Sequence, residues 1–188
     1  PTLHNFGLAK NTITGFEEKV GKDFASHEVL FLLRGLFSIQ LTIAELQSDE
    51  IKIGVYKDLL NKLGSELKKE KRTETGSAVM DAYQQYLPEG FFTTAEEQLK
   101  ITLQLISTML SLEPDNENDV ALLIQPLVYG NYDKESFSGR FFSRNIVTGE
   151  KKLQGMFFQE KFDEVDAVGK DINAIKPAYL EQLEAIAW

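Results

Sequence analysis

Hydrophobic residues recur at helical spacing along much of the chain, and the densest apolar run lies at residues 29–46. This run reads VLFLLRGLFSIQLTIAEL and contains no proline. Its length and its leucine content favour a helix over a strand. A helix that is apolar around most of its circumference is surrounded by other helices in a soluble protein. The sequence therefore predicts a mainly α fold, a helical bundle around a buried central helix at about 29–46.

The polar residues of this run fall on one narrow stripe. Arg34, Ser38, Thr42 and Glu45 follow one another at steps of four, four and three residues, which places them on one face of a helix. One interpretation is a solvent-facing seam on an otherwise buried helix. The other is the wall of a ligand pocket, with Arg34 as a clamp for an anion or a carboxylate. These four residues form the predicted ligand-binding set.

The same spacing predicts further helices around the central one, at about 12–24, 49–71, 77–87 and 95–112. In the last of these, the stripe expected to face the core consists of Leu99, Leu103, Ile106 and Leu110. Hydroxyl side chains stand where N-caps are needed, and the expected capping residues are Ser26, Ser48, and Thr93 or Thr94.

Two later segments differ from the helical segments in their composition and hydrophobic pattern. VALLIQPLVYG, residues 120–130, predicts a helix broken by Pro126, with a buried strand as the alternative. Residues 136–162 are rich in Gly, Ser and aromatic residues, with a turn at 148–150. This pattern predicts a β-hairpin at about 137–160, and a helical alternative stays open. Two short helices should follow, one at about 163–174 and one from Pro177.

The hairpin carries the residues predicted to bind a partner. Strand alternation places Arg140 and Arg144 on one face, and these are two of only four arginines in the chain. Aromatic residues and arginine are enriched at protein interfaces. The predicted partner-binding set is therefore Arg140, Phe142, Arg144 and Trp188, the last being the only tryptophan.

The chain has 188 residues, which suits one domain with a proper core. We find no internal repeat and no linker long enough to divide it. The sequence therefore predicts a single domain at 1–188, made of a helical bundle at 12–129 followed by the hairpin and C-terminal helices at 136–188.

The charge balance narrows the classes of partner. Twenty Lys and Arg stand against 29 Asp and Glu, a formal net charge of −9. This disfavours nucleic-acid binding and adsorption to anionic membranes, and it favours a cationic protein partner. Arg34 and Glu45 argue against a membrane span in the central run. The absence of cysteine fits a reducing compartment, so we expect a cytoplasmic location, although a removed signal peptide would leave no trace.

Motifs for catalysis are absent from the sequence. There is no P-loop, no dinucleotide-binding fingerprint and no nucleophile elbow. The two histidines, His4 and His27, are too few for a usual zinc site, and no helix repeats Glu-x-x-His as di-metal carboxylate proteins do. Asp23 and His27 stand four residues apart and could pair, a contact that we expect to be structural rather than catalytic. The sequence predicts no catalytic residue, no cofactor and no metal.

Three functions remain open at this point. The leading hypothesis is a non-enzymatic, acidic protein-interaction module, such as an inhibitor or immunity-type protein or a subunit of a larger assembly, binding a protein partner or itself. The alternative is a helical carrier of an apolar or amphipathic ligand, with Arg34 at its mouth. The third is a small carboxylate-dependent enzyme.

Overall fold

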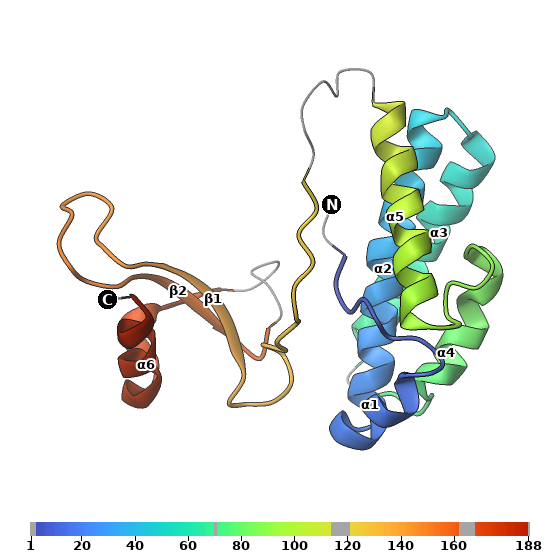
Figure 1. Ribbon diagram of the computed structural model, residues 1–188. Coiled ribbons are helices and arrows are strands. Elements are labelled where there is room, and N and C mark those ends of the chain that lie inside the picture. Colours follow the sequence, from blue (N-terminus) through green and yellow to red (C-terminus); the bar gives the residue numbers. More distant parts are fainter. Residues whose placement is uncertain (1–2, 70, 114–120, 162–167, 188) are drawn as a thin grey trace. The chain divides into compact units, whose positions relative to one another are not determined.

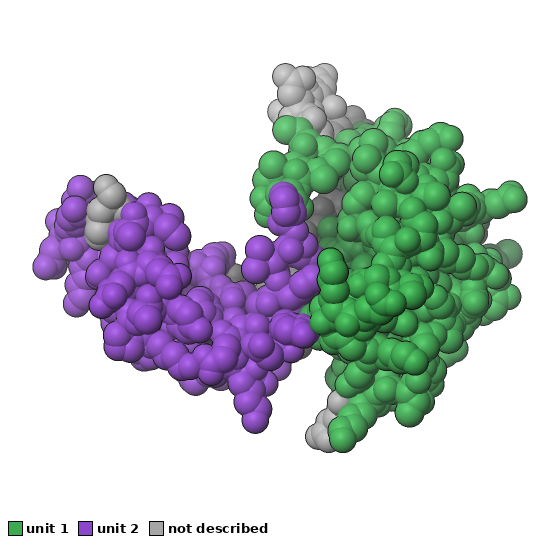
Figure 2. All heavy atoms as spheres, turned by 60° about the horizontal axis from the view of Figure 1, so that its bottom comes forward, with its two compact units in different colours: residues 1–125 green, residues 126–188 purple. Residues whose placement is uncertain are grey.

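The computed structural model describes residues 3–69, 71–113, 121–161 and 168–187. The chain divides into two compact units, residues 1–125 and 126–188 (Figure 2), and each unit has a hydrophobic cluster of its own. The division falls inside the segment predicted as the bundle, 12–129. The expectation of a single domain stays a prediction.

Unit 1 is helical, and its longest helix contacts the other four described in it. The helices are α1 (Ile13–Val20), α2 (Lys22–Leu46), α3 (Glu50–Leu67), α4 (Gly76–Tyr83), which continues into the 3₁₀ turn η1 (Gln84–Tyr86), and α5 (Ala95–Leu112). Figure 1 shows α3 and α5 running alongside α2, and α2 also contacts α1 and α4. The classification of this arrangement as a helical bundle stays a prediction.

The start of α2 differs from the prediction. The helix begins at Lys22 rather than near residue 29, and Ser26 lies inside it, where its Oγ donates to the Asp23 carbonyl at 3.0 Å. Ser26 is therefore not an N-cap. Gly21, with φ of 85°, separates the helices instead: its N–H donates to the Glu17 carbonyl of α1, and its carbonyl accepts from Ala25 of α2. Glycine adopts this positive φ without steric cost.

About half of α2 is buried. Twelve of its 25 residues are buried, among them the large apolar side chains Val29, Leu32, Leu33, Leu36 and Phe37 at 0 % exposure. By length and composition alone, α2 could cross a membrane, but 56 % of its most apolar window is buried inside the protein. The expectation of no membrane span stays a prediction.

The turn between α2 and α3 also differs in its cap. Asp49, not Ser48, caps α3, because its Oδ1 accepts the N–H of Lys52 at 3.1 Å. Ser48 instead takes a left-handed conformation, with φ of 55°. The sharp reversal brings α3 back along α2, where Leu59 and Leu63 are buried.

The side of α5 that is fully buried is not the predicted stripe. Its buried residues are Gln98, Ile101, Thr102 and Met109, whereas Leu103 is 41 % exposed. Gln98 is drawn inward by three hydrogen bonds: its Oε1 accepts from Gly7 N at 2.7 Å, and its Nε2 donates to the Leu8 and Phe91 carbonyls. The N-cap prediction narrows to Thr94, whose Oγ1 accepts from Glu97 N at 3.2 Å.

The segment after α5 is neither helix nor strand over residues 121–129. The prediction of a broken helix is therefore wrong for residues 121–129, and the alternative, a buried strand, is not formed there either. Its large apolar side chains lie in solvent, with exposed fractions of 79 % for Leu123 and 87 % for Val128. Pro126 lacks the N–H that a helix would use.

Unit 2 contains a small antiparallel sheet with the strand order β1-β2-β3. The strands are β1 (Phe137–Phe142), β2 (Gln154–Gln159) and the two-residue β3 (Lys170–Asp171). Phe137 pairs with Gln159 and Phe142 with Gln154, so β1 and β2 form a hairpin in the range where the sequence favoured one over a helix.

The C-terminal part begins differently from the prediction. Within the predicted helix at 163–174, residues 163–167 lie outside the described residues, and the remainder forms β3 and the 3₁₀ turn η2 (Ile172–Ala174). Pro177 does open a helix, α6 (Pro177–Ala187). This helix covers one face of the hairpin and completes a small cluster, whose buried members are Leu153, Phe157, Ile172 and Ile175.

The buried position of Leu33 gives a direct test of the central helix. Leu33→Ala should lower the free energy of unfolding by about 3 kcal/mol, because the transfer energy is lost and a cavity is left. Chemical denaturation of the 188-residue chain measures this. Leu46→Ala, the same change at a 37 % exposed site in the same helix, is the control and should cost less than about 1 kcal/mol. Equal losses would contradict the buried position of Leu33.

Candidate functional site

The polar stripe on α2 lies at the surface. Arg34, Ser38 and Glu45 are exposed and Thr42 is half-buried. The two hydroxyls bond to their own helix: Ser38 Oγ donates to the Arg34 carbonyl at 2.9 Å, and Thr42 Oγ1 donates to the Ser38 carbonyl at 3.1 Å. Glu45 lies 3.7 Å from Lys57 of α3. This position agrees with a solvent-facing seam, and ligand binding by these residues stays a prediction.

A buried polar cluster lies at the start of α2, where sequence reasoning placed none. The Glu28 side chain is fully buried. Its Oε2 accepts from Asn5 Nδ2 at 2.6 Å, and its Oε1 accepts from His27 Nδ1 at 2.7 Å. Asn5 Nδ2 also donates to the Glu28 carbonyl. Charged groups are buried only when paired or hydrogen-bonded, so the arm before α1 is fixed to α2 by these contacts.

This cluster corrects the expected Asp23–His27 pair. His27 pairs with Glu28, and the Asp23 carboxylate instead accepts the N–H of Arg72 at 2.8 Å. The second partner of Glu28 is Asn5, which lies 23 positions away in the chain and has a φ of 61°. No helical spacing connects such residues, which explains why periodicity does not find the contact.

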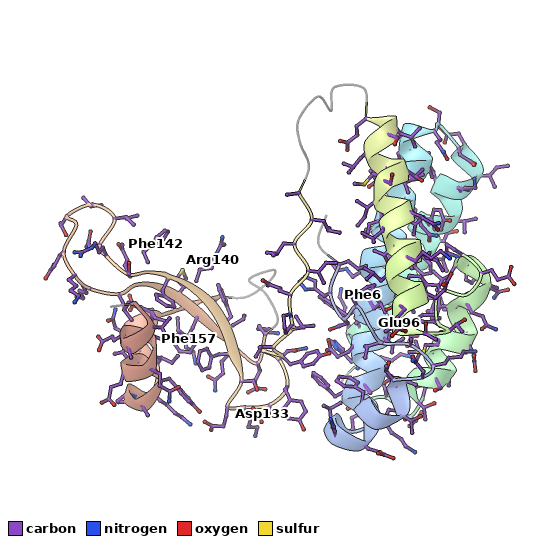
Figure 3. The ribbon with its side chains drawn as sticks, viewed as in Figure 1. Phe6, Glu96, Asp133, Arg140, Phe142 and Phe157 are labelled. Atoms are coloured by element: carbon purple, nitrogen blue, oxygen red, sulfur yellow. The ribbon has the colours of Figure 1, made fainter. Side chains whose placement is uncertain are left out.

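The hairpin has two unlike faces. Phe137, Phe141 and Phe157 pack with α6, whereas Arg140 and Phe142 lie on the opposite face, away from α6 (Figure 3). On that face Phe142 is 57 % exposed, and Met156, which pairs with Arg140, is 48 % exposed. An aromatic ring, a thioether and a guanidinium therefore share one accessible surface.

The loop that joins β1 to β2 is held by its own hydrogen bonds. Asn145 Oδ1 accepts from Val147 N at 2.9 Å and Thr148 N at 3.0 Å, and the Asn145 carbonyl accepts from Gly149 N. Gly149 has φ of 72°. Arg144 lies past the end of β1, and its Nη1 donates to the Gly149 carbonyl at 3.2 Å. It is therefore held by the loop, and not by the strand alternation from which its position was predicted.

The hairpin carries a group of cations. Residues 140–152 contain four of them and a single acid, Glu150. We call these residues the cationic tip: Arg140, Arg144, Lys151 and Lys152. The two lysines are exposed and were missed by sequence reasoning, although their adjacency to the turn was a readable signal. Such a surface in an acidic chain favours an anionic ligand.

The turn before β1 is built around one carboxylate. Asp133 Oδ1 accepts from Ser136 Oγ at 2.8 Å and from Glu135 N at 2.9 Å. These hydrogen bonds, first of all the one from Ser136, hold the pKa of Asp133 below its ordinary value. Ser136 N donates to the Asp133 carbonyl at 3.0 Å, so the turn is closed by both side chain and backbone.

The other candidate places offer less chemistry. A surface pocket of about 330 Å³ in unit 1 is lined by the 84–93 turn and Lys10, and the Lys10 ammonium already lies 2.7 Å from Asp81. The described part of the chain contains no group of three or more acidic or histidine residues able to hold a metal. Trp188, the fourth residue of the partner-binding prediction, lies outside the described residues.

Comparison with known proteins adds what the geometry does not give. No protein-family model matches the chain. The chain is 53 % identical over all 188 residues to a pyruvate, phosphate dikinase of Treponema pallidum, of which it covers 21 %. It is 28 % identical over 184 residues to the chloroplastic pyruvate, phosphate dikinase of Mesembryanthemum crystallinum, and 25 % over 183 residues to that of Flaveria trinervia. Each alignment with the plant proteins covers 92 % of this chain and 19 % of the relative.

These similarities overturn the leading functional prediction. The chain spans about a fifth of the length of the relatives it matches, and those relatives carry the name of an enzyme. The prediction of a non-enzymatic module is therefore wrong, and so are its descriptions as an inhibitor, an assembly subunit or a protein-binding acidic protein. The similarities support an enzyme-related domain. A chain that aligns with only a fifth of an enzyme need not contain that enzyme's catalytic motifs.

The buried cluster predicts a role for Asn5 in holding the arm. Asn5→Ala should lower the free energy of unfolding of unit 1 by about 2 kcal/mol, because a buried carboxylate loses a donor. It should also speed hydrogen exchange at residues 6–9. Denaturation and exchange measured by mass spectrometry check both. Asn61→Ala, at an exposed site on α3, is the control, and an arm that stays protected in Asn5→Ala would refute this role.

The Asp133 turn predicts a pH dependence. A carboxylate whose folded-state pKa is lowered adds stability above its unfolded-state pKa, and this stability is lost as the pH falls through the folded-state pKa. Ser136→Ala should raise the folded-state pKa of Asp133 towards its ordinary value. The pH range between the folded-state and unfolded-state pKa values should then become narrower. Carboxyl ¹³C NMR of Asp133 measures this. The pKa of Asp171, lowered by hydrogen bonds from Asn173, is the internal reference and should not move.

Proposed function

We propose that these 188 residues are part of a phosphotransferase of the pyruvate, phosphate dikinase type. The observation that carries the proposal is the 53 % identity over the whole chain to the Treponema pallidum protein of that name. The weaker similarity to plant proteins of the same name, over 92 % of the chain, points in the same direction. The whole activity would then need the remainder of a longer polypeptide.

The chemistry of phosphoryl transfer indicates what this part could supply. A kinase mainly positions a phosphoryl group and stabilises its negative charge, since the protein has little covalent chemistry to perform. A chain with a net charge of −9 repels polyanions unless cations are gathered locally. The cationic tip is such a gathering, and we propose that it faces a phosphate or a phosphorylated substrate.

Arg144 is the best placed residue for this task. A guanidinium has five donors in a planar fork and binds phosphate oxygens in pairs. The bond from Arg144 Nη1 to the Gly149 carbonyl uses one side of the fork and limits the rotamers of the side chain. Less conformational entropy is then lost when an anion binds. Lys151 and Lys152, after the same turn, would add charge without fixed geometry.

Arg140 differs from Arg144 because it stands on a regular strand. It lies beside Phe142 on the accessible face, opposite Met156. A ligand at this place would meet one cation and two apolar groups, which suits a molecule with an anionic end and a flat or apolar end. The proposal therefore assigns phosphate contact to Arg144 and orientation of the ligand to Arg140, Phe142 and Met156.

The test uses the polypeptide that carries these residues. With a nucleoside triphosphate supplied as the phosphoryl donor, it should convert pyruvate in a phosphate-dependent reaction, and Arg144→Gln should reduce kcat by about 10²-fold, the usual cost of one donor that stabilises transition-state charge. Steady-state kinetics with pyruvate and phosphate varied in turn measure this. Lys68→Gln, which removes an exposed cation just after α3, is the matched control and should leave kcat unchanged.

The outcomes separate the two parts of the proposal. No turnover with pyruvate, phosphate and a nucleoside triphosphate would contradict the dikinase function. Turnover that Arg144→Gln and Lys68→Gln affect equally would retain the function and remove the cationic tip from it.

A further inference from the structure

Sulfur is scarce in this chain, and its burial is uneven. The 188 residues contain no cysteine and three methionines, Met80, Met109 and Met156. Met80 and Met109 are 0 % and 4 % exposed, whereas Met156, near the middle of β2, is 48 % exposed. An oxidant in solution therefore reaches the Met156 sulfur more readily than the other two. No thiol of these residues competes for the oxidant.

Met156 stands in the middle of a row of three side chains that crosses the sheet. It pairs with Arg140 of β1 and with Asp171 of β3. Residues directly opposite in an antiparallel pair share one face of the sheet, with Cβ atoms roughly 4.5–5.5 Å apart. The row lies on the face that carries Arg140 and Phe142, away from α6 (Figure 3). The thioether is thus flanked by a guanidinium on one strand and a carboxylate on the other.

The methyl end of Met156 lies against the residue that leads into β3. A Cβ built on Gly169 would lie 2.6 Å from Met156 Cε and 2.8 Å from Phe158 Cε1. A real Cβ essentially never approaches another atom so closely. The main chain at Gly169 is therefore packed directly on the Met156 and Phe158 side chains.

The ladder between β2 and β3 is short. It consists of two residue pairs, Met156 with Asp171 and Phe157 with Lys170. The packing of Met156 against Gly169 and Asp171 is therefore a large share of what fixes this end of the sheet.

The direction of the backbone groups shows which of the two pairs is hydrogen-bonded. Glu160 N donates to the Ser136 carbonyl of the segment before β1, and backbone groups alternate in direction along an antiparallel strand. The backbone groups of Phe157 therefore point towards β3, and the N–H of Lys170 faces β2. The pair of Met156 with the residue opposite it is of the other kind, in which the side chains lie closer together.

We propose that Met156 is an oxidation site for peroxides and that its sulfoxide weakens the pairing of β3 with β2. A lone pair of the sulfur attacks one oxygen of hydrogen peroxide, and the S–O bond forms as the O–O bond breaks. The departing hydroxide takes the proton of the transferred oxygen and leaves as water. The thioether is oxidised to a sulfoxide, and the peroxide, which accepts the electron pair, is reduced.

The new oxygen conflicts with β3. A sulfoxide is polar where the thioether was apolar, and its oxygen needs a hydrogen-bond donor or water. The Asp171 carboxylate already accepts from Asn173 N at 2.8 Å and from Asn173 Nδ2 at 2.7 Å, and an ionised carboxylate has no proton to donate. Arg140, on the other side of the row, carries donors. The sulfoxide is therefore drawn towards β1, and the contact of Met156 with Gly169 is lost.

Oxidation of the 188-residue chain by hydrogen peroxide tests the site. Met156 should gain oxygen at least about tenfold faster than Met80 and Met109, because accessible sulfur reacts first. Peptide mass spectrometry measures the three rates. The same treatment in denaturant is the control, and there the three rates should converge. Equal rates in the folded chain, or rates that stay as unequal in denaturant, would overturn the proposal.

Hydrogen exchange followed by NMR tests the effect on β3. After oxidation, the Lys170 amide should exchange at least about tenfold faster, whereas the Ser138 amide, which faces Phe158 between β1 and β2, should keep its rate. Met156→Gln, which is polar like the sulfoxide, should accelerate Lys170 without peroxide. Met156→Leu keeps an apolar side chain and should leave Lys170 unchanged before and after peroxide.

The outcomes are independent of the proposed function, because the inference rests on the geometry of unit 2 alone. An oxidised chain in which Lys170 exchanges as slowly as in the unmodified chain would overturn the proposal, whatever the enzyme assays give. So would Met156→Gln and Met156→Leu variants with the same exchange rate at Lys170.

Discussion

The burial of α2 is the constraint on which unit 1 depends. Short helices are unstable alone in water, so α1 and α4, with eight residues each, need a larger apolar surface to pack against. They meet closely, because a Cβ on Gly76 at the start of α4 would lie 2.6 Å from Ile13 of α1. The polar groups within this core, Glu28 and Gln98, bond to the arm that precedes α1. Gln98 thereby supplies partners to backbone groups of the arm that no helix or strand satisfies, and Glu28 holds the arm through the Asn5 side chain.

Much of unit 1 could be predicted from periodicity, because helices repeat their buried positions locally. The ranges of α3 and α5, and the capping role of Thr94, were readable from a few adjacent residues. What could not be read depends on distant partners. Gly21 separates α1 from α2, Asn5 holds the arm to Glu28, and Gln98 is drawn inward by its bonds to Gly7 and Leu8. The prediction for residues 121–129 was wrong for the opposite reason. Their apolar composition predicts a helix or a strand, but residues 121–128 stay exposed to solvent, and residues 121–129 form neither.

The arginines of the candidate site could be predicted from the sequence, but the functional class of the protein could not. Composition pointed to the arginines of the hairpin, and the structure adds that Arg144 is held by Gly149 of the loop. The lysines beside them were overlooked because charged pairs after a turn usually serve solubility. The functional class could not follow from motifs, since the chain corresponds to about a fifth of its relatives. The α2 stripe drew attention for its regular spacing, but spacing describes a face and says nothing of what lies opposite.

The bonds of Gln98 have a consequence for biosynthesis. Gly7 and Gln98 are 91 positions apart in the chain, so the arm gains these partners only after most of unit 1 has left the ribosome. The α2–α3 pair, joined by a short turn, has local contacts and can associate much earlier. Until α5 is made, the surface that it will cover on α2 stays exposed. Nascent unit 1 should therefore be a chaperone substrate at this stage and cease to be one when α5 docks.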